Sequence, residues 1–313
     1  MGSLEKQNLK ELTQHYRDKN DRKNNKKNIY MEQSFHKEDV TVATFYNEKG
    51  YFFLDVGAHD GKTISNTYLL EKKYGWTGIC IEPTQKAFDV LQRNRNVLCV
   101  NKCAYSKSGL ALSFLEYEDI DNKINRSLLS GLKDHSTIPK KFLTKKVKPL
   151  NIIKETITLS ELLDQNNGPI FVAYMSLDTE GSELEILKGI DFNKYIIGYM
   201  DIEHNKKRQE KAIADFLISH GYIYRKRYLS DIDDGFVHKS LLEGSYTTQK
   251  NEIITLKFNN NTELSLISKA QISVCEFYPS KLEFVSPKNY PTGIGKFYYG
   301  YIAFDNNIKW TKN

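Results

Sequence analysis

Cysteine is scarce in this sequence of 313 residues: there are four, and no two of them have C-x-x-C spacing. A structural zinc site built on paired cysteines is therefore not expected. Cys80, Cys99 and Cys103 lie in or beside apolar runs, which indicates buried, reduced thiols and no disulfide framework. Reduced thiols favour a cytoplasmic location. The high Lys, Asn, Ile and Tyr content suggests an AT-rich genome, and the host cytoplasm if that genome is viral.

Long apolar runs are also missing. No stretch approaches the roughly 20 apolar residues that cross a bilayer, so we expect no membrane span. The first 30 residues are polar and lysine-rich and lack the apolar core of a secretory signal. We expect one well-cored domain of about 200 residues with smaller additions, and the sequence does not define an oligomeric state.

The net charge of +6 comes partly from two basic runs, at residues 22–27 and 140–148. One interpretation is a solvated surface. The other is attraction to an anionic substrate such as nucleic acid, a nucleotide-sugar or a phosphorylated glycan.

Apolar runs and helical patterns alternate through the middle of the chain. Continuous apolar runs at 51–56, 78–82, 97–101, 171–178 and 196–203 predict buried parallel strands, and helices are expected near 65–74, 86–94, 159–164, 182 and 208–220. Such alternation predicts an α/β, Rossmann-like, doubly wound sheet. Residues 222–228 and 235–238 resemble a final antiparallel pair.

The two ends of the chain differ from this middle part. We expect residues 1–31 to form a charged arm and residues 32–248 to form the α/β domain. After residue 249 short β-type runs are separated by Asn, Pro and Gly. We expect residues 249–313 to form a small all-β appendage of unassigned role, whose aromatic residues are explained more readily by core packing than by a sugar- or partner-binding face.

The first chemical motif follows the first strand directly. Gly57 and Gly61 permit a tight turn and the close approach of a ligand. Their spacing is not the G-x-G-x-x-G of dinucleotide enzymes. The flanking acidic residues would repel a phosphate and attract a cofactor that carries an ammonium group and a sulfonium.

Glu82 ends the next strand, 21 residues after Gly61. A carboxylate at this spacing can accept hydrogen bonds from both hydroxyls of a ribose. A surface carboxylate before Pro83 is the alternative interpretation, but the turn and Glu82 each predict the other.

Two further acidic motifs end later strands. Asp178 and Glu180 follow one strand, and Glu203 and His204 end the next. Because ligands of open α/β sheets bind at the carboxyl ends of strands, we expect these four residues to gather at the reactive end of the cofactor. They are the candidate catalytic residues, either as a general base or, for Asp178 and Glu203, as ligands of a divalent cation such as Mg²⁺ or Mn²⁺. His204 could instead be a structural histidine.

These motifs, in this order, resemble the FkbM family of methyltransferases. The resemblance covers roughly residues 32–240. It is carried by EQSFHKEDV (32–40), GYFFLDVGAHDG (50–61), SNTYLLEKKYGWTGICIEP (65–83), the Leu-Ser-Gly segment at 129–131, TLSELL (158–163), SLDTEGSELEIL (176–187) and DIEHN (201–205). His59 departs from the family, which more often has Asn there.

The resemblance implies a seven-stranded class I methyltransferase sheet, mostly parallel, with an antiparallel last strand. It implies that S-adenosylmethionine is the cofactor, that Asp55, Gly57 and Asp60 face its methionine part, and that Glu82 holds its ribose. The segment 101–104 would lie near the adenine. The full predicted cofactor-binding set is Asp55, Gly57, Ala58, His59, Asp60, Gly61, Asn66, Glu82, Pro83, Cys103, Ala104 and Asp178.

Family resemblance also implies transfer to a hydroxyl group, most often of a sugar, glycan or polyketide-type metabolite. A nucleic-acid ribose 2′-O-methyltransferase is the first alternative, motivated by the basic charge but weakened by the lack of interleaved aromatic and basic residues in the α/β part. A non-catalytic glycan- or protein-binding module that retains the fold is the second.

Overall fold

The computed structural model describes residues 38–47, 50–117, 126–136, 149–204, 209–225, 233–269, 271–285, 294–299, 301–304 and 308–313. The expected charged arm (1–31) and both basic runs lie outside these residues. Within them, no helix is both long and apolar enough to cross a membrane.

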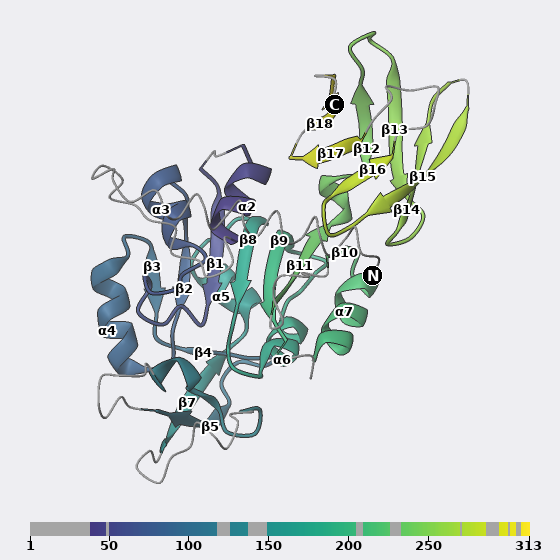
Figure 1. Cartoon of the computed structure of the whole chain (residues 1–313). Coiled ribbons are helices and arrows are strands. Elements are labelled where there is room, and N and C mark those ends of the chain that lie inside the picture. Colours follow the sequence, from purple (N-terminus) through teal and green to yellow (C-terminus); the bar gives the residue numbers. More distant parts are fainter. Residues whose placement is uncertain are drawn as a thin grey trace, which may run out of the picture. The chain divides into compact units, whose positions relative to one another are not determined.

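A seven-stranded mixed sheet forms the centre of the α/β part (Figure 1). Its strands, in order across the sheet, are β10 (Tyr222–Arg225), β11 (Asp233–His238), β9 (Ile196–Glu203), β8 (Phe171–Leu177), β1 (Phe52–Val56), β2 (Thr77–Ile81) and β3 (Leu98–Val100). The pairs from β9 to β3 are parallel. Strand β11, the last strand of this sheet in chain order, runs antiparallel to both of its neighbours, as expected.

Helices connect these strands. They are α2 (Glu38–Phe45), α3 (Tyr68–Tyr74), α4 (Gln85–Asn94), α5 (Leu159–Gln165), α6 (Glu183–Lys188) and α7 (Glu210–Ser219), with short 3-10 turns η1 (Arg126–Leu129) and η3 (Lys239–Leu241). Local chemistry sets their ends: Thr158 Oγ1 accepts a hydrogen bond from Glu161 N at the start of α5. At the end of α3, Gly75 adopts φ +68° and donates to Leu70 O.

Successive residues of a strand face opposite sides of the sheet, and the core is divided accordingly. One apolar cluster contains Phe53 and Cys80 and packs against α2, α3 and α4. The other contains Leu54 and Ile79 and packs against α5, α6 and α7.

A second, smaller sheet lies between β3 and α5 in the sequence. Its strands are β4 (Cys103–Ala104), β7 (Leu150–Ile157), β5 (Ala111–Glu116) and β6 (Gly131–Leu132). Strand β7 was not expected, because its polar, alternating sequence is half exposed on this small sheet and lacks the continuous apolar run of a central strand.

The C-terminal strands close into an eight-stranded antiparallel barrel, drawn in green and yellow in Figure 1. They are β12 (Gly244–Thr247), β13 (Ile253–Phe258), β14 (Glu263–Ile267), β15 (Ile272–Tyr278), β16 (Glu283–Val285), β17 (Ile294–Tyr298), β18 (Tyr301–Phe304) and β19 (Lys309–Lys312). The first strand thus begins before residue 249. Phe277, Phe284, Phe297 and Trp310 are almost fully buried, so these aromatic side chains serve as core.

Candidate cofactor and acceptor site

The carboxyl ends of β1, β2, β8 and β9 border two adjoining cavities. The smaller, of about 60 Å³, is lined by Glu82, Pro83, Cys103, Ala104 and the apolar side chains Ile81, Phe114 and Leu132. The larger, of about 370 Å³, is lined by Asp55, Ala58 and Asn66 and by residues of β9. Gly57, His59, Asp178 and Glu180 line both.

Gly57 allows the ends of β1 and β8 to lie close together at the cavities. Its φ is +86°, and a Cβ atom at this position would lie 1.7 Å from the carbonyl oxygen of Asp178. The amides of Gly57 and Ala58 both donate to Ile81 O at 3.0 Å. No larger residue fits this turn without moving β8 away from β1.

His59 also adopts a left-handed conformation, with φ +47°. Asn visits this region readily, which explains why the resembled family uses Asn there, and His is among the few other residues that tolerate it. The His59 amide donates to Glu82 Oε2 at 2.9 Å. The first turn and Glu82, each of which predicted the other, are therefore in direct contact.

Glu82 is buried and held in one orientation. Thr84 donates to its Oε1 through both the backbone amide (2.8 Å) and the hydroxyl (2.6 Å). Burial raises the pKa of Glu82, although the hydrogen bonds from Thr84 and His59 oppose this shift. Oε1 thus accepts two hydrogen bonds, whereas Oε2 accepts only the one from His59 and keeps a lone pair for a ligand's hydroxyl in the smaller cavity.

Asp60 and Gly61 do not line either cavity. Asp60 Oδ1 accepts from the amides of Lys62 (2.9 Å) and Thr63 (2.7 Å), so its side chain closes its own turn. These hydrogen bonds, with that of His59, outweigh burial and lower the pKa of Asp60. Gly61 packs against Leu91 and Arg95 with no room for a side chain. Their roles are to shape the loop that carries Gly57 and His59.

Asp55 lines the larger cavity, and its negative charge is balanced by the buried side chain of Arg95. Arg95 Nη1 lies 3.5 Å from its Oδ2, and the Thr67 hydroxyl donates to the same oxygen. Burial nevertheless raises the pKa of Asp55. Arg95 also contacts Glu71, Gly61 O and Thr67, and its side chain is completely buried. Nothing in the sequence singles out Arg95, because its partners are 24–40 residues away.

Asp178 and Glu203 form a carboxyl pair in the larger cavity. Burial is the main cause that raises the pKa of Asp178 to about 6; a hydrogen bond with Glu203 opposes the shift, and the charges of Asp233 and Glu183 add to it. Burial and the Asp178 charge raise the pKa of Glu203 well above its ordinary value. Two carboxyl groups this close share a proton, so the pair can act as a general base near neutral pH.

The loop that carries Asp178 and Glu180 is organised by a buried carboxylate. Glu183 Oε1 accepts from Thr179 N, Thr179 Oγ1 and Gly181 N at 2.9–3.0 Å. Gln209, at the start of α7, donates to Gly181 O at 2.7 Å. Glu183 and Gln209 therefore position the loop, and neither was predicted from the sequence. The only feature of the sequence that points to Glu183 is its place in the strongly acidic segment 178–183.

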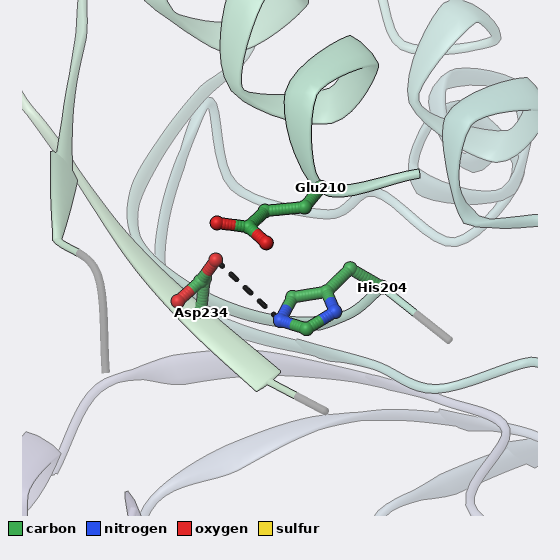
Figure 2. Close-up of side chains that lie close together, drawn as sticks. All are labelled: His204, Glu210 and Asp234. Atoms are coloured by element: carbon green, nitrogen blue, oxygen red, sulfur yellow. Dashed lines mark ion pairs between the residues drawn. The ribbon is translucent and has the colours of Figure 1, made fainter. Parts of the chain in front are cut away.

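His204 is not brought to Asp178, so the expectation that it emerges beside Asp178 is wrong. In the β9–β11 register Glu203 pairs with Asp233 and Ile202 pairs with Asp234. His204 follows the alternation and lies with Asp234 on the opposite face, its Nε2 3.5 Å from Asp234 Oδ2 (Figure 2). Glu210, which is partly exposed, completes this group, and Tyr224 OH lies 3.0 Å from Glu210 and 2.7 Å from Asp234.

Two groups of side chains in the described part of the chain have oxygen or nitrogen atoms close enough to hold a metal ion. One is Asp178, Glu180 and Glu203, and the other is His204, Glu210 and Asp234; in each, the candidate ligand atoms lie within 4.8 Å of one another. The first group contains both residues of the expected cation site. Its all-oxygen set suits Mg²⁺ or Mn²⁺.

Comparison with known proteins agrees with the motifs. Residues 55–224, more than half of the chain, match the Methyltransferase FkbM domain. No curated protein matches. Among solved structures, precorrin-6y C5,15-methyltransferase from Geobacter metallireducens GS-15 aligns at 12% identity and TM-score 0.34, over 64% of this chain and 87% of that chain.

Two other solved structures align similarly. M. capricolum TrmK, in complex with S-adenosyl-homocysteine, aligns at 14% identity and TM-score 0.33, over 66% of this chain and 68% of that chain. M. jannaschii TYW2, in complex with AdoMet, aligns at 12% identity and TM-score 0.30, over 68% and 79%. At these low scores the structural likeness adds no argument to the family match.

Proposed function

We propose that this chain, which belongs to the FkbM methyltransferase family and is an S-adenosylmethionine-dependent methyltransferase, methylates a hydroxyl group of a sugar or glycan. The observation that supports this proposal most is the Asp178–Glu203 carboxyl pair in the larger cavity, because a hydroxyl nucleophile needs a base to remove its proton. When bound, the cofactor would supply an electrophilic methyl group on a sulfonium, with S-adenosylhomocysteine as the leaving group.

The residues of the two cavities fit this cofactor. Glu82 offers a carboxylate oxygen to a ribose hydroxyl, and the side chains of Ile81, Phe114 and Leu132 offer an apolar surface to a purine. Cys103 and Ala104 lie in the same cavity. Carboxylates of the larger cavity favour a cationic centre over a phosphate. We assign cofactor binding to these residues and to Gly57, Ala58, His59 and Asn66.

In the mechanism that we propose, Asp178 accepts the proton of the acceptor hydroxyl. A hydrogen bond with Glu203 moderates the rise in the Asp178 pKa that burial causes. Glu183 and Gln209 hold the loop that carries Asp178 and Glu180. Fixing the acceptor next to the base contributes further, because alignment alone can supply several kcal/mol.

Calorimetric titration with S-adenosylmethionine and S-adenosylhomocysteine tests the cofactor assignment. We expect micromolar binding by the wild-type protein and a loss of about 2–4 kcal/mol, or about 30- to 1,000-fold in Kd, for Glu82→Ala, because the substitution removes a charged acceptor of ribose hydroxyls. The exposed Glu155→Ala variant is the matched control. If the wild-type protein bound neither ligand, the enzymatic proposal would fail. Cofactor binding without turnover on any glycan would favour a non-catalytic binding module.

A metal-assisted route through Asp178 and Glu203 is the second mechanism. A divalent cation there would lower the pKa of the acceptor hydroxyl directly. The base mechanism predicts that exhaustive dialysis against EDTA leaves the rate within about twofold, since general-base catalysis needs no cation. A loss of activity that Mg²⁺ or Mn²⁺ restores would instead establish the metal route.

We do not extend the proposal to nucleic acid. The lining of the larger cavity is acidic, and a polyphosphate backbone would be repelled by it. The basic run at 140–148, which motivated this alternative, lies outside the described residues.

The winding of the sheet and the location of the protein in the cell are two further parts of the proposal. We propose that the α/β sheet is doubly wound, because each of its faces has its own apolar cluster and its own set of helices. We also propose a cytoplasmic location, because all four cysteines are free thiols and three of them are buried.

A further inference from the structure

Two of the four cysteines face each other on neighbouring strands of the central sheet. Cys80 of β2 and Cys99 of β3 are partners in the parallel register. Paired residues of parallel strands point to the same side of the sheet, and neighbouring strands lie about 4.8 Å apart. That spacing is within the range of Cα separations, about 4.4–6.8 Å, that a disulfide bond spans. The two thiols are also hydrogen-bonded to each other.

The two thiols differ in their access to solvent. Cys80 is completely buried in the apolar cluster that packs against α3 and α4. Cys99 is only partly buried, and it lies on β3, which is an edge strand of the seven-stranded sheet. A small oxidant can therefore approach Cys99 from the edge of the sheet, and Cys80 is the next thiol that it meets.

The surroundings of Cys99 favour its thiolate form. A hydrogen bond from Cys80 lowers the pKa of Cys99; burial opposes this shift, and the charge of Arg95 adds to it. Burial raises the pKa of Cys80 well above its ordinary value, that of Cys103 to about 12 and that of Cys275 to about 11. Among the four cysteines, Cys99 alone combines partial exposure with a lowered pKa, and the thiolate is the form that reacts with oxidants.

We propose that Cys99 and Cys80 form a modification site at which a hydroperoxide produces a reversible disulfide bond, and that this bond weakens cofactor binding. Cysteines that sense oxidants are typically accessible thiolates next to a second cysteine that resolves the oxidised product. Disulfides in cytoplasmic proteins are usually transient, so this site agrees with the four free thiols of the resting protein.

The reaction has two steps. The Cys99 thiolate attacks one oxygen of hydrogen peroxide, so that the O–O bond breaks, an S–O bond forms and hydroxide leaves; Cys99 is then a sulfenic acid. The Cys80 sulfur next attacks the Cys99 sulfur, the S–S bond forms, the S–O bond breaks, and the departing hydroxide takes the Cys80 proton to give water. The two thiols together lose two electrons and two protons, and the peroxide is reduced to two molecules of water.

The disulfide would form close to Glu82, to which we assign the cofactor ribose. Glu82 follows Cys80 by two residues, and its amide donates to Val100 O at 3.1 Å. Asn101 Nδ2 donates to the carbonyl oxygen of Glu82 at 2.8 Å, so the end of β3 holds Glu82 in place. The Cβ atoms of a disulfide lie about 3.8 Å apart, about 1 Å less than the strand spacing. Bond formation should therefore shift β3 against β2 and move Glu82 relative to His59 and the smaller cavity.

The test oxidises the full chain with hydrogen peroxide and measures both parts of the proposal. Peptide mapping by mass spectrometry, after free thiols have been blocked, should find the Cys80–Cys99 cross-link, and dithiothreitol should remove it. Calorimetry should show that oxidation weakens the binding of S-adenosylhomocysteine at least tenfold and that dithiothreitol restores it.

Three variants separate this site from general oxidative damage. Cys99→Ser removes the reactive thiol, so its affinity for S-adenosylhomocysteine should be that of the wild type before and after peroxide. Cys80→Ser should leave a sulfenic acid on Cys99, which dimedone labels. Cys275→Ser is the matched control, because it removes a buried cysteine of the barrel, and it should respond to peroxide as the wild type does. If Cys80→Ser failed to fold, the wild type and Cys99→Ser would still decide the question.

The inference would be overturned if peroxide left Cys80 and Cys99 free, if the cross-link instead involved Cys103 or Cys275, or if the cross-linked protein bound S-adenosylhomocysteine as tightly as the reduced protein. None of these results would touch the proposed function, because binding to the reduced protein is measured first. Absence of that binding would instead count against the cofactor assignment.

Discussion

Replacing Asp178 by Asn should lower kcat by about 10²- to 10⁴-fold, the usual contribution of a general base, with little change in the affinity for S-adenosylhomocysteine. Asn has nearly the shape of Asp but cannot accept a proton. Steady-state methyl transfer to a sugar or glycan acceptor, together with calorimetry of the variant, measures the two effects separately.

The pH dependence provides a readout that a purely structural role would not produce. Burial raises the pKa of Asp178 to about 6, and a base acts only when it is deprotonated. The rate of the wild-type enzyme should therefore fall as the pH drops through about 6 and level off above it. The residual rate of Asp178→Asn should lack this step. A variant that kept the wild-type rate would show that another group removes the proton.

Replacing Arg95 by Met should lower the free energy of unfolding by about 3–5 kcal/mol, because it leaves the buried carboxylates of Asp55 and Glu71 without their counter-charge. Denaturant unfolding followed by circular dichroism measures this change. Cofactor affinity should fall with it, since Arg95 also holds Gly61 O at 3.1 Å and thereby the first turn.

Arg93→Met is the matched control, because Arg93 is exposed in the last turn of α4, just before Arg95, and its loss should change stability by no more than about 0.5 kcal/mol. An unfolding free energy of Arg95→Met within 1 kcal/mol of the wild type would mean that Asp55 and Glu71 are neutral in the folded protein or find another partner.

Much of the central sheet could be predicted because each of its buried strands corresponds to one continuous apolar segment of the sequence. A continuous apolar run such as 196–203 is long enough to define a buried strand, and its observed bounds are the same. Strands β12 and β19 were not predicted, because each has only four residues and depends on pairing with the other across the barrel. Such pairing leaves no periodic signal in the sequence.

The candidate site likewise has residues that the sequence predicts and residues that only the tertiary structure brings together. Glu82 and Asp178 could be placed because each ends a predictable strand, and the carboxyl ends of parallel strands meet. His204 was misplaced because adjacency in the sequence was taken as adjacency in space, whereas neighbouring residues at a strand end point to opposite faces. Arg95 and the acidity of the larger cavity arise only from the tertiary structure, which gathers residues from α2 to β11.

Closure of the C-terminal barrel affects how this protein behaves in concentrated solution. Ile272 and Val274 are exposed on the outer surface of β15, a combination that on an open sheet would invite another chain to add a strand. Strand β15 is flanked by β14 and β16, and β19 joins β12 to complete the circle. Among the strands that the structure describes, the barrel therefore has no unpaired edge at which such self-association through backbone hydrogen bonds could begin.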